Sequence, residues 1–401
     1  MHPLPYWRLS GYYFFYFAFI GAFSPYFGLY LQSLSFSAWD IALLMSQMQL
    51  MRLFAPYLWG AFADRLGQRM VIVRLAALLS LLGFASFFLV HGFVAVLLAM
   101  ALLAFFWSAA LPLVETTTFD HLRDQPARYS RIRLWGSIGF IIAVMATGAW
   151  LDRVPLSALL WVIVGTLLGI LACALAVPEA RSQAAAGEQL PLATIVRQPR
   201  VRALFAACFA MSAAHGALYV FYSIYLADHH YSKFLVGSLW SLGVVAEIVV
   251  FFYMGELLRR YGLRRLLLAS FSAAVARFLM IGWGVEWLWL IVVAQVLHGL
   301  TFGAYHAAAI AAVNRWFTGR SQARGQALYS SLSFGAGGLA GSLLSGWTWD
   351  AWGAAATYAI SSAFALLGLL LVVRWVSDED EVGGRGSWRV AEDLSAPGIR
   401  R

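Results

Sequence analysis

Twelve apolar runs, each about 20 or more residues long, constrain the fold of this chain more than any other feature. A run of about 20 residues crosses the hydrocarbon core of a bilayer as one α-helix, and a helix satisfies its own backbone hydrogen bonds there. We therefore predict an all-α integral membrane protein with twelve transmembrane helices. The predicted spans are 10–32, 39–61, 70–90, 93–119, 132–151, 155–177, 203–227, 234–257, 265–284, 286–313, 324–347 and 352–376.

The composition agrees with a chain that lies mostly in lipid. It is 62% hydrophobic and 12% charged, whereas soluble domains are roughly 45–50% apolar and about 25% charged. Lys233 is the one lysine among the 28 basic residues, and a nucleotide-binding P-loop needs a lysine after its glycines. We therefore expect no nucleotide and no cofactor, and transport driven by ATP is excluded for this chain.

The longest polar stretch divides the spans into two groups of six. It covers residues 179–202 and predicts a cytoplasmic linker between an N-terminal six-helix bundle, 1–178, and a C-terminal bundle, 203–376. Residues 377–401 are polar and predict a cytoplasmic tail. The first run is too long for the apolar part of a signal peptide, and no cleavage site of small residues follows it, so we expect a retained helix.

Basic residues are distributed unequally between the predicted loops. The N-terminus, the even-numbered loops and the tail hold 24 of the 28, whereas the odd-numbered loops hold Arg153 and Lys233. Loops rich in arginine and lysine face the cytoplasm. We predict a multi-pass protein of the inner (cytoplasmic) membrane with both termini cytoplasmic. The net charge of +9 then reports topology and not a nucleic-acid partner.

The two halves also resemble each other. Motifs in the first half recur in the second half at offsets of 195 to 198 residues. A parallel repeat of six helices is a common construction of secondary transporters, with the substrate site between the halves. The matched pairs are Gly21–Leu31 with Gly216–Leu226, Gly60–Arg69 with Gly255–Arg264, Ala127–Arg128 with Ala323–Arg324, Gly139 with Gly335, and Asp152 with Asp350.

The segment Gly60–Arg69 resembles the signature that joins helices 2 and 3 in the major facilitator superfamily. The resemblance implies that this segment is a conformational latch on the cytoplasmic side. Its second copy departs from the pattern, because Arg259 stands where the first copy has an acid. The latch residues implied in the first copy are Gly60, Asp64, Arg65, Gly67 and Arg69.

Within that superfamily the chain resembles the lactose-permease-like proton symporters, and most closely their 3-phenylpropionate permease branch. The resemblance rests on Glu115 followed 18 residues later by Arg133, on Arg277, and on the helix-10 pattern Gln295-x2-His298-x2-Thr301. Three departures argue against a sugar substrate. The sugar-binding glutamate of helix 8 in the sugar permeases would fall near Gly243, about one turn from Glu247 of this chain. Phe140 stands where the sugar permeases have a tryptophan that stacks on the sugar ring, and Thr301 stands where they have a proton-bearing glutamate.

Ionisable residues in the middle of the predicted spans are the candidate site, because such groups are costly in lipid and normally face a cavity or a partner. Four are charged, Arg52, Glu115, Glu247 and Arg277. Glu115 and Arg133 lie at matched depth, which fits either a substrate-binding pair that breaks during transport or a permanent ion pair. Arg52 and Glu247 occupy equivalent repeat positions. They fit either an anion-attracting arginine with a proton-carrying glutamate, or a salt bridge that closes the cavity.

Helix spacing adds two stripes of side chains to this set. His298, Thr301, Phe302 and Tyr305 share one face of the tenth span. A second stripe on the seventh span fits packing better than binding. It consists of His215, Tyr219 and Tyr222.

Together these features predict a proton-coupled symporter for a small organic solute, with an aromatic carboxylate such as 3-phenylpropionate as the leading candidate. The alternatives are a sugar or nucleoside proton symporter, a drug:proton efflux antiporter, and a membrane receptor or scaffold that transports nothing. No nucleophile–base pair or metal-ligand spacing supports an enzyme or a metal site, and the expected partners are the solute, the proton and the lipid bilayer. The candidate substrate-binding residues are Arg52, Arg133, Phe140, Arg277, His298 and Tyr305, and the candidate proton-coupling residues are Glu115, Glu247 and His298.

Overall fold

The computed structural model describes residues 4–122, 125, 128–180, 192–318 and 321–377, and within these ranges the fold is all helical. Nine of its helices are long and apolar enough to cross a membrane among the residues described. Two of the nine each contain two spans joined at a glycine with a left-handed backbone, Gly262 at φ 76° and Gly353 at φ 79°. With the more polar second helix, Ala38–Leu66, the spans number twelve.

The N-terminal half contains six spans. Two of them are extended by short 3₁₀ turns, Ser86–Phe88 and Leu156–Ala158. Each predicted span of this half falls on an observed helix, with ends that differ by a few residues. The helices are α1 (Tyr6–Ser33), α2 (Ala38–Leu66), α3 (Arg69–Ala85), α4 (Phe93–Leu122), α5 (Arg128–Leu151) and α6 (Leu159–Ala176).

The C-terminal half also contains six spans, and each of them is either split into shorter helices or joined to a neighbouring span. The tenth and eleventh spans each include a π-helical turn, η3 (Gly299–Ala304) and η4 (Ser331–Gly337). The helices are α7 (Leu192–Val196), α8 (Pro199–Ala214), α9 (Gly216–Asp228), α10 (Lys233–Gly284), α11 (Leu288–Val296), α12 (Tyr305–Trp316), α13 (Ser321–Ser330) and α14 (Gly338–Trp375).

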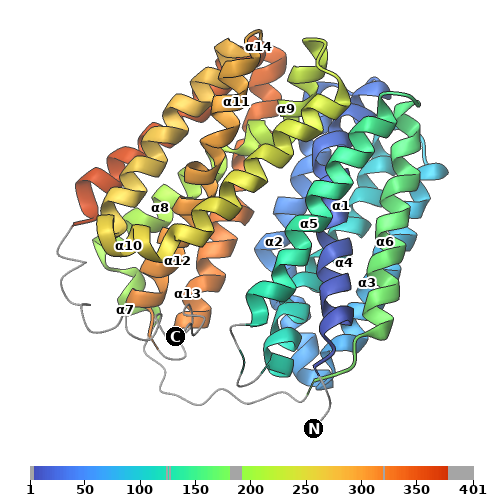
Figure 1. Cartoon of the computed structure of the whole chain (residues 1–401), viewed down its shortest axis with the longest axis horizontal. Helices are drawn as coiled ribbons and strands as arrows, with labels where there is room; N and C mark the ends of the chain where they lie inside the picture. The colour runs from blue at the N-terminus through green and yellow to red at the C-terminus, as the bar shows by residue number, and fades with distance from the viewer. Residues whose placement is uncertain (1–3, 123–124, 126–127, 181–191, 319–320, 378–401) are drawn as a thin grey trace, which may run out of the picture.

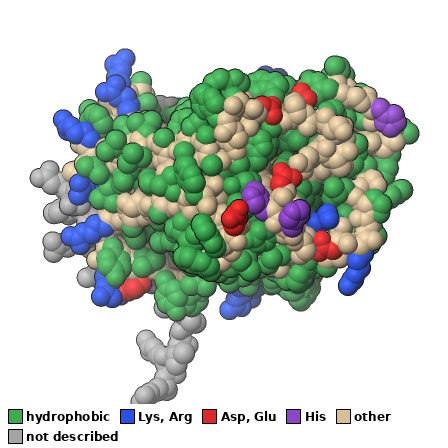
Figure 2. Space-filling view, turned by 90° about the horizontal axis from the view of Figure 1, so that it is seen from above, with side chains coloured by type: hydrophobic (Ala, Val, Ile, Leu, Met, Phe, Trp, Pro, Cys, Tyr) green, Lys and Arg blue, Asp and Glu red, His purple; other side chains and the backbone are tan. Residues whose placement is uncertain are grey.

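The two halves form two bundles that stand side by side (Figure 1). Helices α7 and α13 and the start of α1 lie at one end of the molecule, which we call the proximal end, and the opposite end is the distal end. Figure 2 looks onto the distal end, where acidic and histidine side chains lie among apolar ones. The acidic residues of the distal helix ends and loops are Asp40, Asp152, Asp228, Glu286 and Asp350.

Glycines let helices of each half approach closely at equivalent positions. A Cβ atom on Gly139 of α5 would collide with the backbone of Phe14 in α1, and one on Gly337 of the eleventh span would collide with the backbone of Phe209 in α8. The packing therefore matches Gly139 with Gly337 and corrects the sequence match with Gly335. The register differs because the π-helical turn η4 takes up extra chain just before this contact.

The halves are hydrogen-bonded to each other only at the distal end, among the residues described. The hydroxyl of Tyr26 on α1 donates to the carbonyl of Lys233 at 3.0 Å, and the side chain of Gln32 donates to Asp228 at 3.3 Å. The carboxylates of Asp152 and Asp350 accept further bonds from the opposite half. The bundles are thus joined distally, and toward the proximal end they separate (Figure 1).

Candidate functional site

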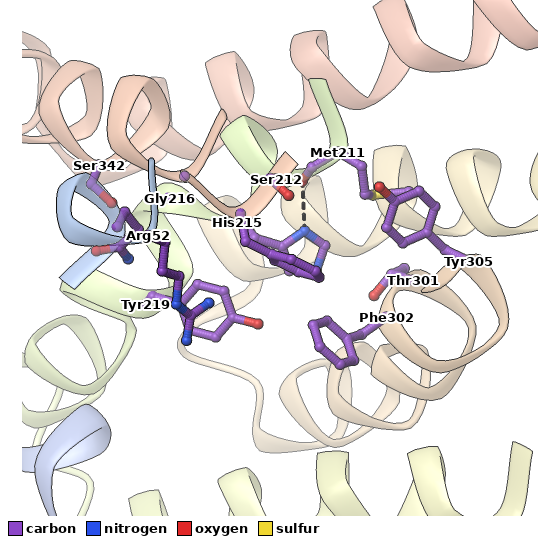
Figure 3. Close-up of a pocket in the computed structure, with 13 residues that line it drawn as sticks. Arg52, Met211, Ser212, His215, Gly216, Tyr219, Thr301, Phe302, Tyr305 and Ser342 are labelled. Atoms are coloured by element: carbon purple, nitrogen blue, oxygen red, sulfur yellow. Dashed lines mark hydrogen bonds between the residues drawn. The ribbon is translucent and has the colours of Figure 1, made fainter. Parts of the chain in front are cut away.

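A pocket lies between the halves. One wall comes from α2 and the others come from the C-terminal half (Figure 3). Residues of the two π-helical turns line it, and π-helical turns occur frequently at functional sites. The lining residues are Gln49, Arg52, Met211, Ser212, His215, Gly216, Tyr219, Thr301, Phe302, Tyr305, Phe334, Gly338 and Ser342.

Arg52 supplies the positive charge of this pocket. Its side chain extends from α2 toward Tyr219 and His215 of the opposite half (Figure 3). The residue is exposed, and in the described part of the chain no carboxylate lies within salt-bridge distance of it. Aromatic rings of Tyr219, Phe302 and Phe334 line the same pocket. An unpaired guanidinium beside aromatic rings is suited to bind a planar carboxylate.

Arg277 is fully buried behind this pocket and is held by neutral acceptors. Its Nε donates to the carbonyl of Ala294 at 2.8 Å, and its Nη1 donates to the hydroxyl of Thr301 at 3.0 Å. Its Nη2 donates to the amide oxygen of Gln295 at 3.3 Å. In the described part of the chain no carboxylate lies within salt-bridge distance of it.

His215 links Arg277 to the pocket wall. Its Nε2 lies 3.3 Å from Nη1 of Arg277, and its Nδ1 lies 2.8 Å from the carbonyl oxygen of Met211. An arginine only donates and a carbonyl only accepts. These two contacts therefore assign a neutral imidazole with the proton on Nδ1 and the lone pair of Nε2 toward Arg277.

Glu247 and His298 form an ion pair or shared-proton contact between α10 and the tenth span. The Nε2 atom of His298 lies 2.6 Å from Oε1 of Glu247, and both side chains are mostly buried. The helices approach here because α10 has a glycine one turn earlier. A Cβ atom on Gly243 would lie 3.1 Å from the ring of His298. The ring of His298 in turn stacks on Phe302, which lines the pocket.

The structure does not bring Glu115 and Arg133 together as an ion pair. The guanidinium of Arg133 lies over the ring of Phe17, 3.8 Å from its centroid. Glu115 instead accepts a hydrogen bond of 3.3 Å from the hydroxyl of Tyr129. The matched depth of Glu115 and Arg133 on sequential helices could not predict this arrangement, because the ring on which Arg133 stacks belongs to α1.

Other predicted residues fall partly in the pocket. Tyr305 lines it and donates to the carbonyl of Cys208 at 3.3 Å. Phe140 is buried where α5 packs on Gly21 of α1, so it does not line this pocket. His215 and Tyr219 line the pocket, although their spacing had favoured packing.

Three polar lining residues escaped the sequence reasoning. Gln49, Ser212 and Ser342 are uncharged, and such residues are common in helices, so nothing in their spacing separates them from packing. Of the three, Gln49 was the easiest to anticipate as a pocket residue, because it lies close to Arg52 on α2.

The predicted latch residues lie at the proximal end of α2 and α3. Gly67 ends α2 in the left-handed conformation, φ 66°, and Arg69 forms a salt bridge with Asp120 of α4. Arg65 is exposed, and the side chain of Asp64 lies outside the described part of the chain. Gly60 has no atom near its Cβ position, so it does not mark a close helix contact in this conformation.

Sequence reasoning also missed the cap of α3. The carboxylate of Glu179, which follows α6, accepts hydrogen bonds from the backbone N–H of Arg69 at 3.1 Å and of Met70 at 2.8 Å. It thereby satisfies two of the free N–H groups at the start of the helix. Glu179 was assigned to the linker, where a capping role has no local sequence signal.

Two pseudo-symmetric six-helix bundles with a polar pocket between them define a membrane transporter. The chain belongs to the MFS_1 like family, whose profile matches residues 6–360. It is 33% identical over 340 residues to a probable 3-phenylpropionic acid transporter of Escherichia coli (strain K12), covering 82% of this chain and 87% of that protein.

Other similar proteins are named for different transported molecules. The maltose permease of Geobacillus stearothermophilus is 27% identical over 384 residues, which cover 93% of this chain and 94% of the permease. A crystal structure of a mutant form of the nucleoside transporter NupG superposes with a TM-score of 0.84 at 17% identity, covering 93% of this chain and 100% of that one. Both support the fold, and the relatives together are transporters of several small molecules.

No three histidine, cysteine, aspartate or glutamate side chains of the described residues cluster so as to hold a metal ion.

Proposed function

We propose that this protein is a proton-coupled symporter that takes up an aromatic carboxylate such as 3-phenylpropionate. The observation that carries the proposal is Arg52, a cation that faces a pocket lined by Tyr219, Phe302 and Phe334 and that has no carboxylate partner among the described residues. A monocarboxylate with an aryl group matches both features, because its anionic end pairs with the guanidinium and its ring packs on the aromatic side chains. The name of the Escherichia coli relative supports the same class of substrate.

Proton coupling is assigned to Glu247 together with His298. A buried carboxylate changes its charge when it takes up a proton, and the cost of moving it between two environments changes with it. Glu247 lies 2.6 Å from His298, and His298 stacks on Phe302 of the pocket. Binding of solute against Phe302 therefore acts on the contact that holds the proton. Glu115, half-buried beside Tyr129, is the second candidate for a proton site.

The proposed setting is the inner membrane with both termini in the cytoplasm. The proximal end then faces the cytoplasm, and the distal hydrogen bonds close the outer side. The proposed moving units are residues 1–178 and 203–376, joined by the linker 179–202 and followed by the tail 377–401. In the linker, residues 181–191 lie outside the described part of the chain, as do residues 378–401 of the tail.

A sugar or nucleoside symporter is the second candidate. Uncharged hydrogen-bonding side chains in the pocket, Gln49, Ser212 and Ser342, suit hydroxyl groups. The maltose permease among the relatives points the same way.

A binding screen on the purified protein separates these candidates. Ligands that bind the folded state stabilise it by an amount that grows with the logarithm of their concentration relative to Kd, and this raises the unfolding temperature. We expect stabilisation by 3-phenylpropionate and much less by its neutral amide. Stabilisation by maltose or a nucleoside, with none by aromatic acids, would overturn the substrate assignment.

Transport is tested in proteoliposomes with an imposed pH gradient. We expect accumulation of labelled 3-phenylpropionate when the gradient is directed inward, and none when a protonophore removes it. Exchange of solute that does not respond to the pH gradient would overturn proton coupling. Solute leaving the vesicles while protons enter would favour a drug:proton antiporter. Movement of no solute at all would favour a receptor or scaffold.

A further inference from the structure

The sequence match between Asp152 and Asp350 has a structural counterpart at the distal end. Asp152 follows α5 in the N-terminal half, and its carboxylate accepts hydrogen bonds from the backbone N–H of Lys233 at 2.7 Å and of Phe234 at 3.0 Å. These N–H groups belong to the first turn of α10, in the opposite half. Asp350 lies in α14 and accepts from the backbone N–H of Trp39 at 3.0 Å.

The two contacts are related by the internal repeat. Trp39 is in the first turn of α2, and Phe234 holds the matching position in α10 at an offset of 195. Each aspartate therefore lies in one half and caps the first turn of a helix in the other half. We call these two contacts, Asp152 with α10 and Asp350 with α2, the distal clasps.

The loops before the capped helices are also alike. Each helix has a serine cap of its own, Ser37 for α2 and Ser232 for α10, whose hydroxyl accepts from the backbone N–H three residues later. Ser35 and His230 precede these caps at matching positions and share a left-handed backbone, with φ of 65° and 64°. The same loop geometry thus presents free N–H groups to an aspartate from the other half in both copies.

Small residues let each aspartate reach its helix. Gly148 lies one turn before Asp152, and a Cβ atom there would collide with the carbonyl of Lys233. Gly346 lies one turn before Asp350, and a Cβ atom there would collide with Ala42 of α2. Close approach and capping thus occur together at both clasps.

Helix starts carry a partial positive charge from their free N–H groups, and a carboxylate interacts favourably with it. A carboxylate from the opposite half makes this interaction depend on whether the halves are in contact. When the distal ends separate, both carboxylates and both helix starts lose these partners. Local serine caps stay with their helices in either state, so they do not distinguish the two states.

We propose that Asp152 and Asp350 are paired clasps that hold the distal end closed and set how often it opens. This inference rests on the proposed alternating-access function for its biological meaning, but the clasps themselves are testable without any substrate. Spin labels report the separation of the halves directly. In a chain with Cys173 and Cys208 replaced, cysteines at Ser157 and Glu286 place one label on each half near this end.

We expect a single short distance for the parent and an added population at longer distance for Asp152→Asn, for Asp350→Asn and, more strongly, for the double variant. Asp40→Asn is the matched control, because the hydrogen bonds of the Asp40 carboxylate in the described structure go to Ser37 in its own half. Its distance distribution should equal that of the parent. A double variant that elutes as a monodisperse protein and shows the parental distribution would overturn the proposal, as would an equal shift in Asp40→Asn.

Transport measured on the same variants separates this inference from the proposed function. If the parent moves no solute, the function fails while the distances still test the clasps. If the parent accumulates 3-phenylpropionate but the distances do not shift in the double variant, the clasps fail while the function stands.

Discussion

The imidazole of His298 lies 2.6 Å from the carboxylate of Glu247, and this contact joins the tenth span to α10 beside the pocket. In the described part of the chain no arginine lies within salt-bridge distance of Glu247, although Arg277 lies nearby in the same half. The charge of the pair therefore depends on the number of protons that it holds. This is the property that a coupling site needs.

Glu247→Gln should abolish the response of uptake to the pH gradient while exchange of solute continues. Glutamine has nearly the same shape and keeps a hydrogen-bonding group toward His298, but it cannot take up the coupling proton. The measurement compares gradient-driven uptake with exchange in proteoliposomes. Glu256→Gln is the matched control, because Glu256 is an exposed acid on the same helix that pairs with Arg259.

Glu115→Gln tests the second candidate for the proton site in the same assay. If the gradient still drives uptake in Glu247→Gln but not in Glu115→Gln, the coupling site lies in the N-terminal half. Unchanged coupling in both variants would show that neither carboxylate carries the proton.

Arg52→Ala should weaken binding of an aromatic carboxylate by roughly 10- to 100-fold. Hydrogen bonds to charged groups contribute about 1.5–3 kcal/mol, and about 1.4 kcal/mol corresponds to a tenfold change in Kd. Binding is measured by calorimetry for the acid and for its neutral amide. The amide lacks the charge that pairs with Arg52, so its affinity should change little. An equal loss for both ligands would mean that Arg52 shapes the pocket without recognising the carboxylate.

The elements of the fold were predictable because membrane spans have a strong and local signature. Length, apolarity and arginine clusters located every span, and the repeat predicted two related halves. The site was harder because it is assembled across helices. Arg52 and His298 were singled out as candidates because a charged side chain or a polar ring inside a membrane span is rare. The stacking of Arg133 on Phe17 depends on the rotation of α1 against α5, which no spacing within either helix specifies.

Packing between helices also explains why the sequence matched Gly139 with the wrong glycine of the second half. Gly335 and Gly337 are both glycines in one stretch, and the sequence alone does not show which of them packs on α8. The π-helical turn η4 decides it, and a π-helical turn has no reliable sequence signal. The distal clasps were visible in the sequence only as a matched pair of aspartates. Their role required the knowledge that each one reaches the opposite half.

Glu179→Ala should loosen the start of α3 without unfolding the bundle. Loss of a helix cap costs about 0.5–2 kcal/mol, and here one carboxylate caps the N–H groups of both Arg69 and Met70. Hydrogen exchange should therefore become faster at the first residues of α3 and stay unchanged at the start of α2, which has its own serine cap. Equal exchange in parent and variant at α3 would contradict the capping role.

Gly139→Ala should lower the unfolding temperature strongly, whereas Gly165→Ala should not. Both glycines lie inside helices of the N-terminal half, so the change in helix propensity is the same and favours alanine by about 1 kcal/mol. A methyl group at Gly139 would collide with the backbone of Phe14, and backbone atoms cannot move aside as a flexible side chain does. No atom lies within 4 Å of the Cβ position of Gly165. The helices α1 and α5 must therefore separate in the first variant, and the loss of their packing outweighs the gain in propensity. Thermal unfolding of the two purified variants beside the parent measures the difference, and equal midpoints for both would contradict the close contact of α1 with α5.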